Sequence, residues 1–207
     1  MKLHASNRTP YGRKVRIVLA EQGLPYDRDT AGASQKPLAE LAGRNPALRV
    51  PILEDGGRVL CESNLIIEYL LATYADRAAD APRPLLAPAV ARAEHAWADR
   101  GLLGVLDALL EAAVNLRQLG MDGVTPTQSP YLQRHQQRIA RILDWLEPRA
   151  QPEGLIPGWF SVQDVALVSV LQFGEHFDIF AWRGRPRLEA LMARLDQRPS
   201  VAGTRPD

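Results

Sequence analysis

The chain has 207 residues, of which 46% are hydrophobic and 24% charged, as expected of a globular protein with one large or two small domains. Its 25 Lys and Arg residues against 24 Asp and Glu give a net charge of +1, without the basic excess of nucleic-acid-binding domains, so we expect no nucleic-acid partner. Cys61 is the only cysteine, which excludes a disulfide framework and a cysteine-rich zinc site within one chain.

The first third of the chain predicts alternating strands and helices. Leu3 to Ser6 is a short strand candidate. Tyr11 to Gln22 carries apolar residues at helical spacing and stops at Gly23, a residue type common at helix C-termini. Pro25 to Asp29 predicts a second strand, and Lys36 to Gly43 predicts a short helix. This alternation is typical of a small α/β domain.

A β-hairpin is predicted next. Val50 to Glu54 and Arg58 to Glu62 are short apolar runs on either side of the turn Asp55-Gly56-Gly57. Ser63 stands at the expected N-cap of a strongly apolar helix that runs through Tyr74. The hairpin and this helix complete the predicted α/β domain.

Proline is frequent over residues 80–88, which predicts an extended linker between a first domain, 1–79, and a second domain, 89–207. No strand signal occurs beyond the linker, so we expect the second domain to be all-α. Its predicted helices are Ala89 to Leu119, Ser129 to Arg149, Ser161 to Phe177 and Arg187 to Arg198.

The third of these helices has the clearest local motif. Ser161 and Asp164 have the spacing of a capping box, in which each side chain bonds the backbone N–H of the other residue. The residues that follow are nearly all apolar, as expected of a helix buried on every side. We expect this motif to stabilise the domain and to have no catalytic role.

The turn Thr9-Pro10-Tyr11-Gly12 lies where a strand ends and a helix begins. Unpaired N–H groups and the helix dipole favour an anion at such a place. A hydroxyl at Thr9 could donate a hydrogen bond to a bound thiolate. To be half ionised at neutral pH, a thiol of pKa about 8.5 needs about 2 kcal/mol of stabilisation of its thiolate. One charge-assisted hydrogen bond contributes about 1.5 to 3 kcal/mol. The alternative is that Thr9 is only an N-cap.

Two further motifs could bind parts of an extended ligand. Pro51 cannot donate to a strand ladder, so with a cis bond the backbone of Val50 could pair with a peptide-like molecule. The helix that starts at Ser63 has no capping box, so its N-terminus could receive a carboxylate while Glu62 binds an ammonium group. Each motif also fits a purely structural role, as a strand start or as a helix cap.

The remaining candidates are single residues. Lys36 and Arg49 could pair with a second carboxylate, or could be solvated surface charges. Cys61 lies in an apolar strand and is expected to be a small buried residue rather than a nucleophile. We expect no metal site, because the histidines show no ligand spacing; they are His4, His95, His135 and His176.

These motifs, in this order, resemble those of the glutathione S-transferase family over nearly the whole chain. The segments that carry the resemblance are SNRTPYGRKVRIVLAEQGLPY, NPALRVPILEDGGRVLCESNLIIEYL, SVQDVALVSVL and RPRLEALMARLDQRPSVAGTRP. The resemblance is closest to bacterial members with Ser or Cys at the first strand-to-helix turn, where this chain has Thr9. It implies a thioredoxin-like α/β N-terminal domain followed by an all-α C-terminal helical domain, usually as a homodimer.

The resemblance also implies which residues act. Thr9 corresponds to the residue that contacts the glutathione sulfur, and is the implied catalytic residue. Val50, ahead of a cis Pro51, corresponds to the residue whose backbone pairs with the cysteinyl unit. The implied glutathione-binding residues are Thr9, Lys36, Arg49, Val50, Pro51, Glu62 and Ser63.

In this resemblance Glu62 and Ser63 correspond to the binders of the γ-glutamyl group, and Arg49 or Lys36 would meet the glycyl carboxylate. The family's fold places the reaction in the cleft between the domains. The electrophile is then expected between Thr9 to Tyr11 and the first long helix, around Trp97, Gly101 and Gly104.

Two functions of different classes follow. The first is a glutathione transferase, which adds the thiolate of glutathione to a small hydrophobic electrophile, as in detoxification. The second is a glutathione-binding scaffold of the same fold with little turnover, since threonine adds a methyl group and a stiffer χ1 at position 9. No signal-peptide pattern and no run of roughly 18 apolar residues is present, so we expect a cytoplasmic protein without membrane contact.

Overall fold

The computed structural model describes residues 1–31, 37–74 and 93–207. Lys36 and the predicted linker at 80–88 lie outside the described residues, so the domain boundary stays a prediction. The chain divides into two compact units. Unit 1 comprises Met1–Leu85 and Pro199–Asp207, and unit 2 comprises Leu86–Arg198.

Unit 1 contains a four-stranded sheet with the order β2-β1-β3-β4. β1 pairs in parallel with β2 and antiparallel with β3, and β3 and β4 form the predicted hairpin. The strands contribute buried apolar residues such as Leu3, Ile52 and Leu53 to the core. Their bounds are β1 (Lys2–His4), β2 (Asp27–Asp29), β3 (Ile52–Asp55) and β4 (Arg58–Cys61).

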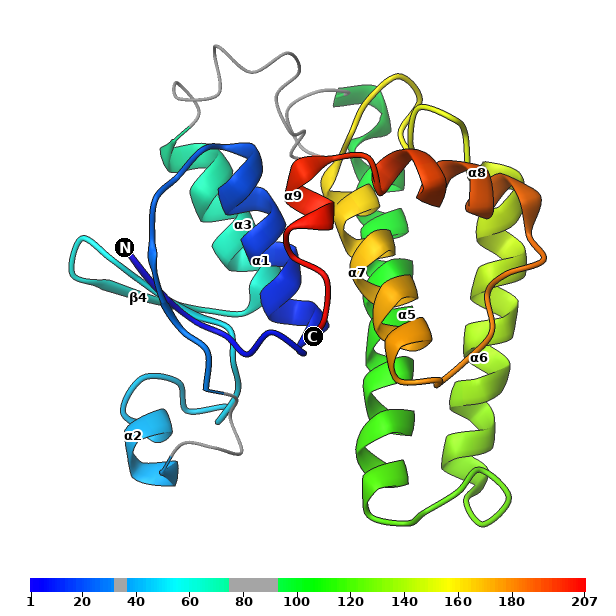
Figure 1. Ribbon diagram of the computed structural model, residues 1–207, viewed down its shortest axis with the longest axis horizontal. Coiled ribbons are helices and arrows are strands. Elements are labelled where there is room, and N and C mark those ends of the chain that lie inside the picture. The colour runs from blue at the N-terminus through cyan, green and yellow to red at the C-terminus, as the bar shows by residue number, and fades with distance from the viewer. Residues whose placement is uncertain (32–36, 75–92) are drawn as a thin grey trace. The chain divides into compact units, whose positions relative to one another are not determined.

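The helices of unit 1 are α1 (Pro10–Glu21), α2 (Leu38–Ala42), α3 (Ser63–Thr73) and α9 (Pro199–Ala202). α1 and α3 lie side by side on the same side of the sheet (Figure 1). Every residue of α1 from Gly12 to Leu19 is buried, including three cationic side chains. α1 ends as predicted, with Gly23 in the left-handed conformation at φ 61°.

The C-terminal segment packs on α1, a long-range contact that no local sequence pattern indicates. Residues from Pro199 on were assigned to the second domain, whereas they belong to unit 1. Val201 of α9 is fully buried, and its carbonyl accepts a hydrogen bond from Nη2 of Arg13 at 3.2 Å. Nε of Arg13 donates to Oγ1 of Thr204 at 3.5 Å. A buried cation on α1 is therefore paired with the last turn of the chain.

Unit 2 is helical. Its α-helices are α5 (Ala96–Met121), α6 (Pro130–Leu146), α7 (Val162–His176) and α8 (Pro186–Leu195), with 3₁₀ turns at Ala93–His95 and Glu147–Arg149. α5 and α6 form an antiparallel pair, and α7 packs along α5 (Figure 1). In the described part of unit 2, β-pairing is limited to two isolated bridges. The predicted order along the chain, an α/β part followed by a helical part, is confirmed.

The predicted capping box is confirmed. Oγ of Ser161 accepts from the Asp164 backbone N–H at 3.4 Å, and Oδ2 of Asp164 accepts from the Ser161 backbone N–H at 2.8 Å. From Val162 to Gly174 every residue of α7 is buried. None of the helices within residues 1–31, 37–74 and 93–207 is both long and apolar enough to cross a bilayer.

Candidate functional site

A small pocket opens on unit 1 where three segments meet. These are the loop that precedes β3, the first turn of α1 and the N-terminus of α3. The pocket has a volume of about 30 Å³. Five predicted site residues, four from two separate motifs and the single candidate Arg49, are thus brought together. Its lining residues are Tyr11, Arg49, Val50, Pro51, Glu62 and Ser63.

The loop before β3 contains the predicted cis peptide bond, between Val50 and Pro51. Asn45, which is 3% exposed, holds this loop in shape. Its Nδ2 donates to the carbonyl of Arg49 at 2.8 Å, and its Oδ1 accepts from the N–H of Ala47 at 2.9 Å. The backbone that leads into the cis bond is therefore fixed by a buried side chain.

Glu62 has φ 71° and ψ 123°, a conformation that costs a residue other than glycine about 1 to 3 kcal/mol. Glu62 is also the N-cap of α3, whereas the sequence placed Ser63 there. The reason is that the first helical hydrogen bond runs from the Ile66 N–H to the Glu62 carbonyl. The Glu62 side chain makes no capping hydrogen bond, so it leaves the N-terminus of α3 open to a ligand.

The first turns of α1 and α3 are joined by a buried polar contact. Nζ of Lys14, whose side chain is fully buried, donates to Oδ1 of Asn64 at 2.5 Å. Because Tyr11 and Ser63 come from the same two turns, this contact fixes two walls of the pocket relative to each other. We therefore regard Lys14 and Asn64 as positioning residues.

Thr9 is the N-cap of α1, but its side chain makes no capping hydrogen bond. A Cβ added to Gly12 would lie 2.8 Å from Cγ2 of Thr9, so the threonine methyl group faces Gly12 closely. The hydroxyl must occupy another staggered position. Thr9 is half-exposed and is not among the residues that line the pocket.

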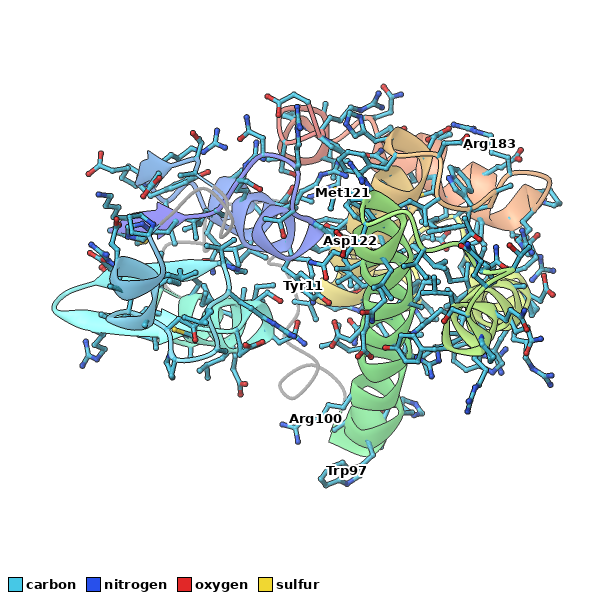
Figure 2. All side chains as sticks on the ribbon, turned by 90° about the horizontal axis from the view of Figure 1, so that it is seen from below. Tyr11, Trp97, Arg100, Met121, Asp122 and Arg183 are labelled. Carbon is cyan, nitrogen blue, oxygen red and sulfur yellow. The ribbon has the colours of Figure 1, made fainter. Side chains whose placement is uncertain are left out.

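Tyr11 also lines the pocket, although it is not among the residues predicted to bind glutathione. Its side chain is half-buried on the first turn of α1 (Figure 2). The sequence signal was present, because Pro10 marks the first helical position and Tyr11 follows it. Sequence periodicity alone could not show whether this side chain packs inward or faces a ligand.

The two candidate cations have different outcomes. Arg49 is exposed and lines the pocket, whereas Lys36 lies outside the described residues. Trp97, expected near the electrophile, stands at the beginning of α5 and is 81% exposed (Figure 2). The guanidinium of Arg100 lies 5.4 Å from the centre of its ring.

Cys61 and the histidines have structural surroundings. Sγ of Cys61 donates to the Arg44 carbonyl at 3.5 Å, and burial raises the pKa of this thiol, which disfavours the thiolate. His4 lies between Asp29 and Glu54, at 2.9 Å from each carboxylate. Within the part of the chain that the structure describes, no group of three or more His, Cys, Asp or Glu residues is arranged to hold a metal ion.

Comparisons with known proteins identify similar domains and folds. Residues 3–78 match the glutathione S-transferase N-terminal domain. A stringent starvation protein A homologue of Coxiella burnetii is 40% identical over 70 residues, 34% of this chain and 33% of that protein. The matches to the first curated relatives span about a third of their length. A probable maleylacetoacetate isomerase of Vibrio cholerae is 29% identical over 94% of this chain and 90% of that protein.

The likeness to solved structures extends over both units. A glutathione S-transferase from Methylobacillus flagellatus, solved with GSH (glutathione) bound, has a TM-score of 0.81 and 25% identity, with coverage of 100% of this chain and 99% of the other. Its fold and the family match agree with the implied thioredoxin-like N-terminal domain and helical C-terminal region. Residues 3–78 therefore belong to the glutathione S-transferase N-terminal domain family, and the whole chain has the fold of a solved glutathione S-transferase.

Proposed function

We propose that this protein binds glutathione at the pocket of unit 1 and adds its sulfur to a small electrophilic compound. The observation that carries the proposal is that Val50, Pro51, Glu62 and Ser63, chosen from separate motifs, line one pocket. Glutathione is an extended tripeptide with an amino-acid head and a carboxylate tail. The pocket offers a complementary group to each of these parts.

In this proposal the backbone of Val50 pairs with the cysteinyl unit, as a short added strand would. The carboxylate of Glu62 binds the γ-glutamyl ammonium group. The Ser63 hydroxyl and the open N-terminus of α3 bind the adjoining carboxylate. Arg49 meets the glycyl carboxylate, with Lys36 as a second cation. The strained backbone of Glu62 is then explained by its function, because it presents the acid beside the helix N-terminus.

The chemical step needs the glutathione thiolate. The thiol proton leaves to solvent, the sulfur forms a bond to the electrophilic carbon, and the displaced group departs with the bonding electron pair. We propose that the Thr9 hydroxyl donates a hydrogen bond to the thiolate. Such a charge-assisted bond contributes about 1.5 to 3 kcal/mol, enough for the ionisation at neutral pH. Placing the two reactants together supplies the rest.

A glutathione-binding scaffold is the second candidate. It is favoured by a specific observation, since Thr9 does not line the pocket and its methyl group packs against Gly12. Binding would then be retained through Val50, Glu62 and Ser63, while thiolate stabilisation would be weak. Tyr11, which does line the pocket, would be the nearer hydroxyl.

Calorimetric titration with glutathione tests the binding part. Ser63→Ala removes a hydroxyl from the open helix end, and we expect it to weaken glutathione binding about tenfold. Ser6→Ala, at a half-exposed serine of unit 1 outside the pocket, is the matched control and should bind like the native protein. Absence of binding at millimolar glutathione would refute both candidates.

Steady-state rates with an aryl halide and with maleylacetoacetate test the chemical part. Thr9→Val keeps the methyl group and removes only the hydroxyl. We expect it to lower kcat/KM about tenfold to a hundredfold and to raise the pKa of bound glutathione, measured by thiolate absorbance. Thr9→Ser should retain activity. Glutathione binding without turnover, equal in native protein and Thr9→Val, would support the scaffold, and a loss confined to Tyr11→Phe would transfer the role to Tyr11.

We also propose a cytoplasmic homodimer that acts in detoxification, on the strength of the resemblance to the glutathione S-transferase family alone. Light scattering at micromolar concentration tests the dimer. A mass that stays at 22.9 kDa over this range would exclude it.

A further inference from the structure

A larger pocket, of about 390 Å³, lies entirely within unit 2. This volume is within the range of about 300 to 1,000 Å³ that small-molecule sites occupy. The pocket exists because α7 has 15 residues and α5 has 26, so that α7 ends before the α5–α6 pair does (Figure 1). Met121 and Asp122 mark the end of α5 near this pocket, and Trp97 stands at the opposite end of the helix (Figure 2).

Two walls of this pocket are helix ends with fixed geometry. α5 ends with Gly123 at φ 78°, and the Val124 N–H donates back to the Leu119 carbonyl at 2.9 Å. α7 ends in the same way, with Asp178 at φ 51° and the Ile179 N–H bonded to the Gly174 carbonyl at 2.8 Å. Val124, Asp178 and Ile179 line the pocket. The walls are therefore formed without a ligand.

The pocket combines one cation and one acid with an apolar surface. The guanidinium of Arg117 lies 4.6 Å from the centre of the Phe177 ring, a contact that favours this position of the cation at the wall. Asp178, the next residue after Phe177 in the sequence, is exposed and also lines the pocket. Within the described residues, neither Arg117 nor Asp178 forms an ion pair. Half-buried apolar side chains complete the lining: Leu116, Val124, Pro126 and Ile179.

We propose that this pocket binds a small zwitterion with an apolar body, of the class of free amino acids with aromatic or branched side chains. The ligand carboxylate pairs with the planar guanidinium of Arg117. The ligand ammonium pairs with Asp178, at the C-terminal end of α7, where the helix dipole also favours a cation. The ligand side chain covers Leu116, Val124 and Ile179. This site goes beyond the proposed function, because it shares no residue with the pocket of unit 1.

L-Phenylalanine is the probe, measured by amide chemical shifts of the full-length protein. Saturable shifts are expected at Val124 and Ile179 in the millimolar range. Arg117→Met keeps the stem of the side chain and removes its charge. Asp178→Asn keeps a residue type suited to the left-handed conformation. Each substitution should weaken binding about tenfold, as the loss of one charge-assisted contact does.

Two ligands that each carry only one of the two charged groups show which protein residue binds which group. Binding of 3-phenylpropanoate should be weakened by Arg117→Met and not by Asp178→Asn, whereas phenethylamine should show the reverse. Arg134→Met, at an exposed arginine of α6 outside the pocket, is the matched control and should leave all three affinities unchanged. Ser63→Ala should leave them unchanged as well, which separates this site from the glutathione pocket. If Arg117→Met does not fold, Asp178→Asn and phenethylamine still carry the test.

The proposal is overturned if L-phenylalanine gives no saturable shift up to its solubility limit. It is also overturned if the shifts fall on unit 1, or if Asp178→Asn binds L-phenylalanine as tightly as the native protein. None of these results depends on whether glutathione binds.

Discussion

α1 in unit 1 and α7 in unit 2 are both buried along most of their length, but they bury opposite charges in different ways. α7 buries the acid Asp164, whose hydrogen-bond donors come from Leu155 and Ser161, within nine residues. α1 buries Arg13, whose acceptors are Val201 and Thr204 at the far end of the chain. The difference shows that a buried charge can be satisfied by its own segment or only by the completed fold.

This difference predicts how far the effect of a substitution should extend from the substituted residue. Changes around Asp164 act on one loop and one helix end. Changes at Arg13 act on the docking of the C-terminal segment to α1. Substitutions at both places therefore test whether local and long-range satisfaction contribute comparably to stability.

The largest effect is expected at Gly154, in the loop that encloses Asp164. An added Cβ would lie 2.3 Å from the Trp159 carbonyl oxygen and 2.9 Å from Oδ2 of Asp164, at φ 149°. We expect Gly154→Ala to lower the free energy of unfolding by about 3 to 5 kcal/mol in denaturant titration. Gly158→Ala is the control, since its Cβ meets nothing within 4 Å at φ 79°. Equal losses in the two variants would show that backbone conformation, and not the close contact, matters.

The next effect is the pH dependence that Asp164 confers. Burial raises the pKa of this carboxyl from 3.8 to about 6, against the hydrogen bonds from Leu155 and Ser161. The native state therefore binds the proton more tightly than the unfolded state does. The contribution of this group is fully present below about pH 4 and is lost as pH rises through about 6, by at most about 3 kcal/mol. In denaturant titrations, the free energy of unfolding of the native protein should fall by up to about 3 kcal/mol relative to that of Asp164→Asn as the pH rises from about 4 to above 6. A difference between the two proteins that stays constant over this range would contradict the raised pKa.

Arg13→Met should have an intermediate effect. It removes the hydrogen bonds from the guanidinium to the Val201 carbonyl and to Oγ1 of Thr204, while keeping most of the buried stem of the side chain. We expect a loss of about 2 kcal/mol in the free energy of unfolding and faster proteolysis after residue 198. Arg8→Met is the control, because exposed Arg8 also contacts the C-terminal segment, at the Asp207 carbonyl. A loss as large for Arg8→Met would mean that burial of the cation is unimportant.

The smallest effect compares the two N-caps directly. Ser161→Ala removes a buried hydroxyl that takes part in the capping box, and should cost about 1 kcal/mol. Thr9→Val removes the N-cap hydroxyl of α1, whose side chain makes no capping bond, and should change the free energy of unfolding by less than about 0.5 kcal/mol. Thermal unfolding of both variants measures the contrast. A comparable loss at Thr9 would indicate that its hydroxyl has a structural partner in solution.

Most of the fold could be predicted because its signals are local. The hairpin of β3 and β4, the end of α1 at Gly23 and the capping box of α7 each depend on residues a few positions apart, and all three are confirmed. The cis bond between Val50 and Pro51, which the family resemblance implied, is also present. The helix starts were less accurate, as at α3, where Glu62 and not Ser63 is the N-cap.

The candidate site was predicted as a set of residue types, and its geometry was not. Sequence motifs proposed Arg49, Val50, Glu62 and Ser63 one by one, but only the packing of α1, α3 and the loop before β3 makes them neighbours. That packing also brings in Tyr11, and leaves Thr9 out of the lining.

By itself the sequence determined most of the elements, the capping box of α7 and the resemblance to the glutathione S-transferase family, because these depend on neighbouring residues and on the order of motifs. Only the tertiary structure decided that the last residues join unit 1, that Glu62 adopts a positive φ, and that Arg117 and Asp178 line one pocket. These features arise where segments far apart in the chain meet. Local sequence propensities do not determine these contacts, because the contacts depend on the burial of surfaces that only the whole fold brings together.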